Sequence, residues 1–443
     1  MQLSKNKKYQ YLFFFLLSIF VILNGGNSNL LIQFNFVFIS LFFLYCLNDK
    51  NYKLHLTKFY YENEKNLILY IIFLIYIIFQ LIPFPINFLK LLNNEKFFIL
   101  TNLNSNYQFS SISLSPSDTF FQILNYISLL LVFLVFKMIF YTKRHRDRFN
   151  IFMSFMGFIS SFVAVIFYLY GNSDFYFIKN SLYEDSSTGF FINRTVSAIF
   201  LLFCLISSLE LFKDIDNKNF LLKKDIFFVK IYLRLFIIFI TLGIITSFSR
   251  TANFLLLLTI LFYLIDNIFF SKNNSVSFKY LIIAIILFDI AIIGFYFGTS
   301  QIVDRFYFLK DEFASLNYDK TILSRLVIAK FSLDEFKNFL FFGYGAGSYE
   351  YLFQLKFINP GNSFANHAHS DLVEFLGEFG VIGFFLISIL VYKIFLQIFV
   401  FNIYNCILIS YLVIILIFDF SFHVPLIQML FIIFFSLNKK LFR

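Results

Sequence analysis

The sequence predicts an all-α integral membrane protein that crosses the bilayer many times. Of its 443 residues, 59% are hydrophobic and only 14% are charged. Apolar stretches recur along the chain at lengths near the ~20 residues that a helix needs to span a bilayer. The connections between these stretches are short and polar, apart from one long segment late in the chain. Together these observations argue against a soluble fold.

The apolar stretches, taken in order, predict about twelve transmembrane helices. Residues 1–298, with nine helices, and residues 379–443, with three, are expected to form a single membrane domain. The helices are expected at residues 11–24, 30–47, 67–82, 119–140, 149–170, 194–212, 229–249, 251–270, 280–298, 379–400, 404–420 and 424–438.

Residues 299–378 connect the ninth and tenth of these helices and form a far longer segment than an ordinary connection. Loops of that length are commonly functional or contain helices of their own. Residues 321–336 carry apolar side chains at helical spacing, which predicts an amphipathic helix within the loop. The glycines that follow, Gly343, Gly345 and Gly347, do not match a phosphate-binding loop because no strand precedes them and no Lys follows. A tight turn is expected there.

The distribution of Lys and Arg predicts the orientation in the membrane. If the N-terminus is cytoplasmic, basic residues concentrate in the tails and in the even-numbered connections, most densely at residues 143–148. The short outer connections carry only Lys90, Lys96 and Lys179. Because cytoplasmic loops are enriched in Lys and Arg, both termini are expected in the cytoplasm and residues 299–378 on the outer face. The net charge of +10 therefore reflects topology, and no nucleic-acid partner is expected.

Residues 366–383 gather two histidines and three carboxylates directly before an apolar stretch. A neutral His369 could accept a proton from a hydroxyl nucleophile, or it could be an ordinary solvated loop residue. If a helix begins near Asp371, then Asp371, Glu374 and Glu378 share one face, which invites comparison with the carboxylate pair of glycoside hydrolases. The first two of these carboxylates also fit N-terminal capping and dipole complementarity, which is the stronger interpretation.

No metal site is expected from the sequence. The pair His367 and His369 is separated by one residue and has no nearby Cys or third His, so it is weak evidence for a zinc site. The three cysteines, Cys46, Cys204 and Cys406, lie far apart within apolar stretches, and we interpret them as small buried hydrophobic residues.

Two arginines lie at the ends of predicted helices on the outer face. Arg194 begins the sixth helix, and Arg250 lies at the turn between the seventh and eighth. A guanidinium binds phosphate oxygens bidentately and keeps its proton, so these residues with a histidine-bearing loop could form an oxyanion site. Alternatively, each arginine simply extends to lipid headgroups.

Several short segments together resemble the O-antigen ligase and O-antigen polymerase superfamily of bacterial envelope glycosyltransferases. The resemblance covers most of the chain from Gln80 onward. Three residues depart from the family pattern: Ser370 stands where Asn is usual, and Thr195 and Val196 replace the usual Asn-His. The matching segments are Gly189-Phe-Phe-Ile-Asn-Arg194, Ser249-Arg250, Ser324-Arg325, Gly343-Tyr-Gly-Ala-Gly-Ser-Tyr349, His367-Ala-His-Ser-Asp-Leu372, Glu378-Phe-Gly-Val-Ile-Gly383 and, as in one branch, Asp419-Phe-Ser-Phe-His-Val-Pro425.

The resemblance implies a glycosyltransferase of the bacterial inner (cytoplasmic) membrane. Such an enzyme moves a glycan from an undecaprenyl-pyrophosphate carrier to an acceptor hydroxyl, such as that of lipid A-core, on the periplasmic face. It implies an inverting, metal-independent reaction without a cofactor or nucleotide sugar. Carried over to this sequence, the resemblance implies that His369 is the general base or acceptor-orienting group. The expected diphosphate ligands are Arg194, Arg250 and Arg325. The other expected substrate-binding residues are His367 and Asp371.

The motifs do not report the acceptor. A ligase uses a lipid A-core sugar, a polymerase uses a second lipid-linked glycan, and a third variant glycosylates protein. A polysaccharide or solute transporter is the rival from another class. Carriers usually place their sites near the bilayer midplane, often between internal repeats, whereas the polar residues here cluster at one predicted face and no repeat is evident.

Overall fold

The computed structural model describes residues 2–102, 107–171, 186–216, 226–270, 278–281, 283–285, 287, 324–357, 364–398 and 402–437. Helices make up nearly all of these residues. The exceptions among them are loops and two short strands, β1 (Phe84–Pro85) and β2 (Phe109–Ser110), which pair antiparallel with Phe84 opposite Ser110. The predicted all-α class is therefore confirmed.

Eight helices in the described ranges are long and apolar enough to cross a membrane. Two further apolar helices, α16 (Ile403–Phe418) and α17 (Pro425–Ser436), are shorter. The expected helix at 280–298 lies mostly outside the described residues, so the number of about twelve stays a prediction. The eight are α2 (Asn29–Leu47), α3 (Lys50–Leu81), α6 (Pro116–Ile139), α7 (Lys143–Leu169), α8 (Arg194–Asp216), α9 (Ile226–Thr246), α10 (Arg250–Ile265) and α15 (Asp371–Ile398).

The helices pack around α8. It contacts α7, α9, α10 and α17, and 94% of its most apolar stretch is buried, against at most 50% in the other candidate spans. Those other spans leave large apolar side chains such as Phe162 and Phe385 exposed on the outside of the bundle. Apolar surface of this kind is stable only when lipid covers it, so the described packing agrees with a membrane protein.

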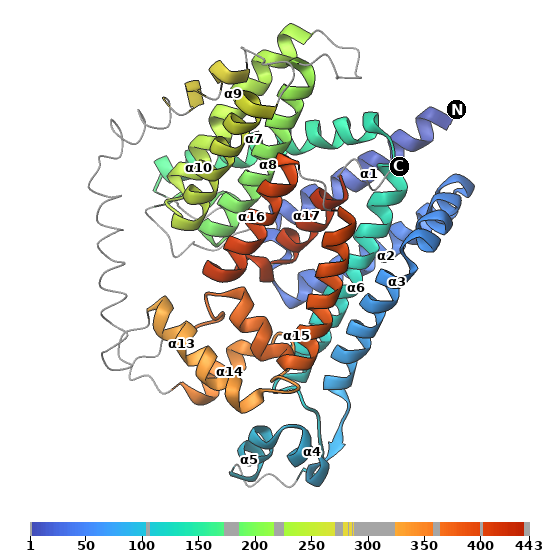
Figure 1. Cartoon of the computed structure of the whole chain (residues 1–443), viewed down its shortest axis with the longest axis vertical. Coiled ribbons are helices and arrows are strands. Elements are labelled where there is room, and N and C mark those ends of the chain that lie inside the picture. The colour runs from blue at the N-terminus through green and yellow to red at the C-terminus, as the bar shows by residue number, and fades with distance from the viewer. Residues whose placement is uncertain are drawn as a thin grey trace.

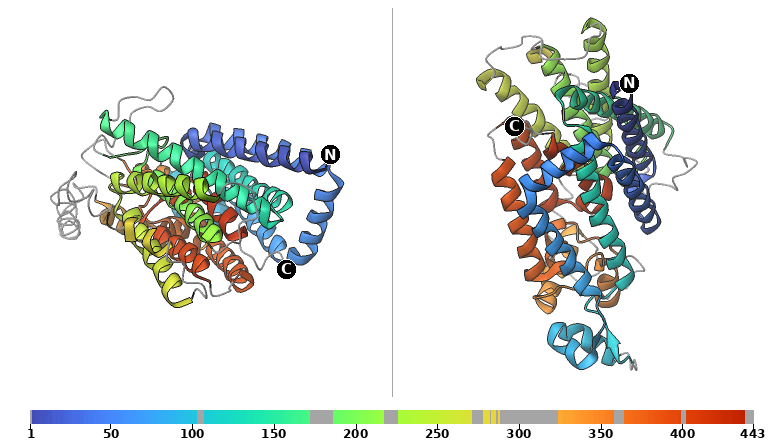
Figure 2. Two further views of the ribbon diagram at one scale, coloured as in Figure 1. Left: turned by 90° about the horizontal axis from the view of Figure 1, so that it is seen from above. Right: turned by 90° about the vertical axis from the view of Figure 1, so that its right-hand side faces the viewer.

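Several short helices lie at one end of the molecule. Figure 1 shows α4 (Ile86–Leu92), α5 (Asn94–Asn102), α13 (Arg325–Phe336) and α14 (Tyr349–Lys356) at the lower end, away from the start of α1 (Gln2–Ile22) and the end of α17, and the right-hand view of Figure 2 agrees. The helix α13 lies where the sequence predicts an amphipathic helix. Which end faces the cytoplasm stays a prediction.

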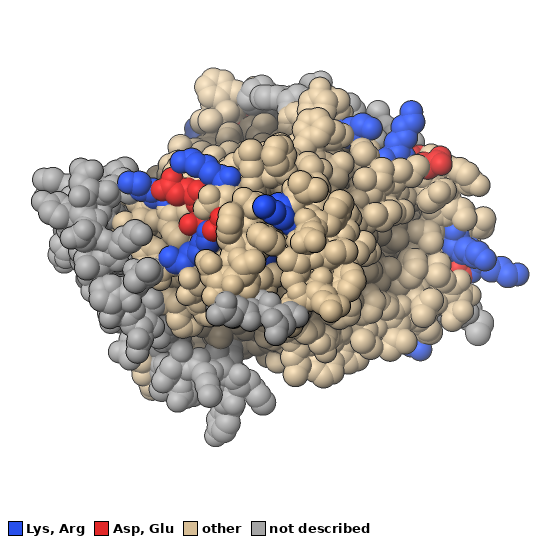
Figure 3. All heavy atoms as spheres, turned by 90° about the horizontal axis from the view of Figure 1, so that it is seen from below, with Lys and Arg blue, Asp and Glu red and all other residues tan. Residues whose placement is uncertain are grey.

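One lysine joins three of these short helices. The ammonium of Lys356 on α14 lies 2.5 Å from a carboxylate oxygen of Glu95 on α5 and 2.7 Å from one of Glu335 on α13. Seen from below, acidic and basic side chains gather beside the grey residues, whereas uncharged side chains cover most of the rest of the face (Figure 3). The short helices α5, α13 and α14 are therefore joined to one another by ion pairs.

The helix α15 is interrupted at Gly380, where φ is 60° and ψ is −176°. The chain before α14 passes beside this break. Val381 donates its N–H to the carbonyl of Leu340 at 2.8 Å, and Tyr344 donates to the carbonyl of Gly377 at 2.9 Å. These bonds satisfy backbone groups that the break leaves without helical partners. The start of α15 is thereby held against the glycine-containing segment, and the predicted domain boundary at 378/379 lies within this helix.

Gln80, near the end of α3, is hydrogen-bonded both to the start of α15 and to the glycine-containing segment before α14. Its fully buried side-chain amide donates to the carbonyls of Phe342 at 2.8 Å and Glu378 at 2.9 Å, and its oxygen accepts from the N–H of Ala346 at 3.2 Å. One amide thus satisfies three backbone groups of two segments that are distant in sequence.

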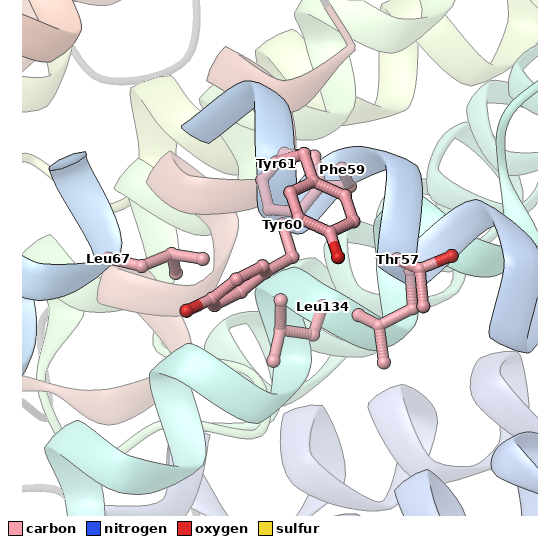
Figure 4. A pocket seen from close by; sticks show the side chains of 7 residues that line it. Thr57, Phe59, Tyr60, Tyr61, Leu67 and Leu134 are labelled. Carbon is pink, nitrogen blue, oxygen red and sulfur yellow. The ribbon is translucent and has the colours of Figure 1, made fainter. Parts of the chain in front are cut away.

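A pocket of about 280 Å³ lies beside α3, which is itself irregular at Asn63. Figure 4 shows side chains of α3 on either side of it, with Leu134 of α6 below. None of the predicted site residues lines this pocket, so it plays no part in the site below. Its lining residues are Leu56, Thr57, Phe59, Tyr60, Tyr61, Leu67 and Leu134.

We expect Gly380→Ala to destabilise the protein more than Gly171→Ala does. Both glycines have positive φ, but an added Cβ at Gly380 would lie 2.4 Å from the carbonyl oxygen of Phe341, whereas one at Gly171 would meet nothing within 4 Å. The backbone strain at Gly380 costs about 1–3 kcal/mol before the clash is counted. The midpoint of thermal unfolding in detergent measures both effects. Equal losses in the two variants would contradict the importance of the close approach.

Candidate active site

The predicted site histidines lie on the loop directly before α15. Both rings contact Phe420: the ring of His367 stacks on it at 4.9 Å between centroids, and the ring of His369 meets it edge-on at 5.1 Å. His369 adopts a positive φ of 57°, which is uncommon for a residue with a side chain. The loop therefore folds so that both histidines pack on the connection between α16 and α17.

Glu374, in the first turns of α15, holds this loop in place. One carboxylate oxygen lies 3.0 Å from Nδ1 of His367, and the other accepts the N–H of Ala368 at 2.7 Å. The carboxylate is almost fully buried. Because both oxygens contact the loop, Glu374 determines where the His367 ring sits.

His423 lies at the centre of the three carboxylates of α15. Its Nδ1 is hydrogen-bonded to Asp371, whose other oxygen accepts the N–H of Phe422 at 2.8 Å. Its Nε2 lies 3.3 Å from an oxygen of Glu374 and 3.9 Å from one of Glu378, without the geometry of a hydrogen bond. The three carboxylates share one face, as the spacing predicts, and that face is turned toward His423.

Asp371 and Glu374 lie in the first turn of α15, as dipole complementarity predicts, but the three carboxylates do not form capping hydrogen bonds there. Among the described hydrogen bonds, Asp371 accepts from Phe422, Glu374 accepts from Ala368, and Glu378 accepts from Gly347 at 2.7 Å. The carboxylate oxygens thus accept hydrogen bonds from other segments and not from the first N–H groups of α15. The reason is that the face they share is buried against the loops rather than open to solvent.

The two environments shift the histidine pKa values in opposite directions. Burial, together with the nearby positive charge of Arg325, lowers the pKa of His369 to about 4. Burial also disfavours the charged form of His423, but the Glu374 and Asp371 carboxylates outweigh this effect and raise its pKa well above the usual range. At neutral pH His369 is therefore neutral and His423 is an imidazolium.

The three predicted arginines all begin helices. Arg325 begins α13 after Ser324, whose side chain accepts the N–H of Val327 at 3.3 Å. Arg194 and Arg250 begin α8 and α10, and the residues beside them are joined by a hydrogen bond of 3.1 Å from the Ser249 hydroxyl to the Thr195 hydroxyl. All three arginines are half-buried.

The structure brings most of the predicted site together. His367, His369 and Asp371 lie on or directly before the start of α15, and Arg325 is close enough to His369 to act on its charge. Arg194 and Arg250 begin helices whose adjoining residues Thr195 and Ser249 are in contact. The segment before Arg194 reaches the connection that carries His423, because Phe191 and Val424 both pack against Gly25.

Sequence reasoning left His423, Glu374 and Glu378 out of the site. His423 is 52 residues from its partner Asp371, so only the folded chain shows the contact. Two signals were available: the periodicity of the carboxylates, and the Asp419–Pro425 segment, which carries His423 within a motif of one branch of the superfamily.

The cluster also has the composition of a cation site. One donor atom each from His367, Glu374 and His423 lie within 4.8 Å of one another, and two histidines with a glutamate are a known ligand set for zinc. The same atoms approach one another at 3.0 and 3.3 Å, so protons on the rings can neutralise the carboxylate as well. The three side chains could therefore bind a cation, or the Glu374 carboxylate could instead be neutralised by protons on the two imidazole rings.

We expect the stability of the protein to fall between pH 6.5 and pH 4 partly through His369. With its pKa lowered from 6.5 to about 4, the unfolded chain takes up a proton in this range that the folded chain does not. The folded state is therefore disfavoured as the pH falls. His369→Gln should reduce the fall in the thermal unfolding midpoint, whereas His55→Gln, at an exposed histidine, should not. An unchanged pH dependence in His369→Gln would refute the assignment.

Comparisons with known proteins test the resemblance. The search of curated proteins found no match. The model of the O-antigen ligase family matches residues 235–388, a segment that includes Arg250, Arg325, His367, His369 and Asp371. Arg194 and His423 lie outside the match. Residues 235–388 are thus similar to the O-antigen ligase family, and the match confirms the resemblance of this membrane protein to the O-antigen ligase superfamily.

Proposed function

We propose that this protein is an O-antigen ligase-like glycosyltransferase of the bacterial inner membrane. It moves a glycan from an undecaprenyl-pyrophosphate carrier to an acceptor hydroxyl, that of lipid A-core, on the periplasmic face. The family match supports a membrane enzyme of this superfamily that acts on lipid-linked glycans. The donor, the acceptor and the orientation are parts of the proposal.

The observation that carries the proposal is the proximity of a neutral histidine and an arginine at one end of α15. Burial and the charge of Arg325 keep His369 unprotonated at neutral pH. Transfer of a glycan to a hydroxyl has two requirements. One group must accept or orient the hydroxyl proton, and a positively charged group must stabilise the negative charge of the departing diphosphate. These two requirements are met by His369 and Arg325, with His367 and Asp371 beside them.

The reaction is a single displacement that inverts the sugar and uses no metal or cofactor. The acceptor oxygen attacks the anomeric carbon while the bond to the diphosphate breaks. Arg194, Arg250 and Arg325 bind the diphosphate, because planar guanidinium groups pair bidentately with phosphate oxygens and keep their charge. His369 orients the acceptor hydroxyl or takes its proton.

A polymerase of the same superfamily is the alternative, since the described site is compatible with a second lipid-linked glycan as acceptor. A transporter is less compatible. Its site would be expected near the middle of the bundle, whereas the histidines and carboxylates described above gather at one end of α15 and on the loops beside it.

A deletion strain tests the function. We expect its lipopolysaccharide gel to lose every glycan-bearing band, while a blot shows glycan accumulating on the carrier lipid. A core that bears a single repeat unit would identify a polymerase instead. An unchanged gel with an unchanged carrier blot would refute both forms of the proposal.

We expect His369→Ala to abolish transfer while the protein still folds. Without the imidazole, no group at this position can orient the acceptor hydroxyl or accept its proton. The measurement is complementation of the deletion strain, with membrane levels of the protein as the control for folding. Wild-type glycan bands in the variant would remove His369 from the mechanism.

We expect Arg325→Gln to raise the donor KM by about 10-fold or more, because hydrogen bonds to charged groups contribute about 1.5–3 kcal/mol. Arg234→Gln is the matched control, since Arg234 is exposed on α9 and lies over the ring of Phe212. Transfer by purified protein with an extracted carrier-linked glycan provides the measurement. Equal KM values in the two variants would place Arg325 outside the donor site.

A further inference from the structure

We propose that a structural zinc ion binds beside the start of α15 and joins three segments of the chain. Its ligands are His367 from the loop before α15, Glu374 and Glu378 from α15, and His423 from the connection between α16 and α17. His423 supplies the further histidine that the local sequence lacks. The inference goes beyond the proposed function and does not depend on it.

The spacing of three ligand atoms fits a zinc ion. Oε1 of Glu374 lies 3.0 Å from Nδ1 of His367 and 3.3 Å from Nε2 of His423, and the three atoms lie within 4.8 Å of one another. Zinc binds nitrogen and oxygen at about 2.0–2.2 Å, so two ligands of a tetrahedral site are separated by roughly 3.3 Å. The other oxygen of Glu374 accepts the N–H of Ala368 at 2.7 Å and so leaves Oε1 for the ion.

The buried Nε2 of His423 is an independent indication of a missing ligand. This side chain is 7% exposed, and Nε2 has no hydrogen-bond partner among the described residues although it faces Glu374. The other ring nitrogen, Nδ1, is hydrogen-bonded to Asp371. Histidines that bind zinc are commonly held in this way, because a carboxylate on one nitrogen fixes the orientation of the ring and directs the other nitrogen at the metal.

Glu378 supplies the fourth ligand. Its Oε1 accepts the N–H of Gly347 at 2.7 Å, whereas its Oε2 lies 3.9 Å from Nε2 of His423. An approach by roughly half an ångström brings Oε2 to the ligand spacing of a tetrahedral site. Four protein ligands close the coordination sphere, which is the pattern of structural and not of catalytic zinc. The proposed displacement therefore has no step at the ion.

Aromatic rings hold both histidines in place. The ring of His367 stacks on Phe420 at 4.9 Å between centroids, and that of His423 stacks on Phe375 at 4.4 Å. An apolar surround of this kind keeps water from competing for the ion. The His367 side chain is 23% exposed, which gives the ion a path into the site.

The charge and the chemistry of the cluster favour zinc over other cations. Asp371, Glu374 and Glu378 are buried together, and a divalent ion supplies two positive charges among them where an imidazolium supplies one. On binding, the ion takes the place of the hydrogen on Nε2 of His423. Imidazole nitrogens suit zinc, whereas Mg²⁺ and Ca²⁺ prefer oxygen ligands.

The test measures zinc in the full-length protein, purified in detergent through a tag without histidines. After removal of metals with a chelator and dialysis against zinc, we expect stoichiometric zinc by elemental analysis. His367→Gln should lose this zinc, because it removes a ligand at the partly exposed edge of the site. His369→Gln, the same change at the other histidine of the loop, is the matched control and should keep it.

Two further measurements examine the ion in the wild-type protein. Zinc should raise the thermal unfolding midpoint of the wild-type protein but not that of His367→Gln, because an ion that binds only the folded state stabilises it. Co²⁺ in place of zinc should give the strong visible absorption of four-coordinate cobalt.

Asp371→Asn tests the partner of His423. We expect it to weaken zinc binding by about 10–100-fold, the usual effect of changing a residue that orients a ligating histidine. Unchanged zinc affinity in this variant would overturn the assignment of Nε2 of His423 as a ligand.

Wild-type protein without stoichiometric zinc would overturn the proposal. Equal zinc content in His367→Gln and His369→Gln would also overturn it, because it would show an adventitious ion only. The weak absorption of six-coordinate cobalt would overturn the closed site of four protein ligands. None of these measurements uses a glycan donor or acceptor, so failure of the proposed function would leave their results unchanged.

Discussion

The burial of three carboxylates on one face of α15 is the constraint on which the rest of the site depends. Asp371, Glu374 and Glu378 are each at most 1% exposed, and an unpaired buried charge is very costly. The imidazolium of His423, on the connection between α16 and α17, offsets part of this charge. The carboxylate oxygens that do not face it accept backbone N–H groups of neighbouring loops. Charge pairing therefore joins four separate segments at one point.

The break in α15 makes this arrangement possible. The non-helical geometry at Gly380 exposes backbone groups to the chain that precedes α14, and these pair with it directly. Gln80 of α3 then binds both segments, with Tyr76 donating to the carbonyls of Phe342 and Phe379 one turn away. The start of α15 is thus fixed to the membrane bundle on one side and to the short helices on the other.

The consequence for chemistry is that two histidines of one loop, separated by one residue, have opposite surroundings. His367 faces a carboxylate and is partly open, whereas His369 faces a positive charge and is mostly enclosed. Side chains of one type that lie in such different surroundings are suited to different tasks in one reaction. Both histidines lie in the segment that matches the O-antigen ligase family, and in the proposed reaction this difference would give them separate roles.

The fold class could be predicted from the sequence because a membrane helix is visible in a short stretch of consecutive residues. A bilayer requires about 20 apolar residues in succession, and helix geometry repeats every few residues, so composition and periodicity suffice. The same local reasoning predicted the helix near residues 321–336 and the shared face of the three carboxylates. It also led to the O-antigen ligase resemblance, since each motif is a run of adjacent residues.

The partners of those residues were decided only by the tertiary structure. The contact of Asp371 with His423 spans 52 residues, and that of Gln80 with Glu378 spans 298. The protonation states of His369 and His423 depend on burial and on charges from other elements, which no local pattern encodes. The sequence by itself determined which segments are apolar enough to cross a membrane, and its motifs supplied the candidate site residues. The packing of distant segments decided which of those residues meet, because contact and desolvation are properties of the folded chain.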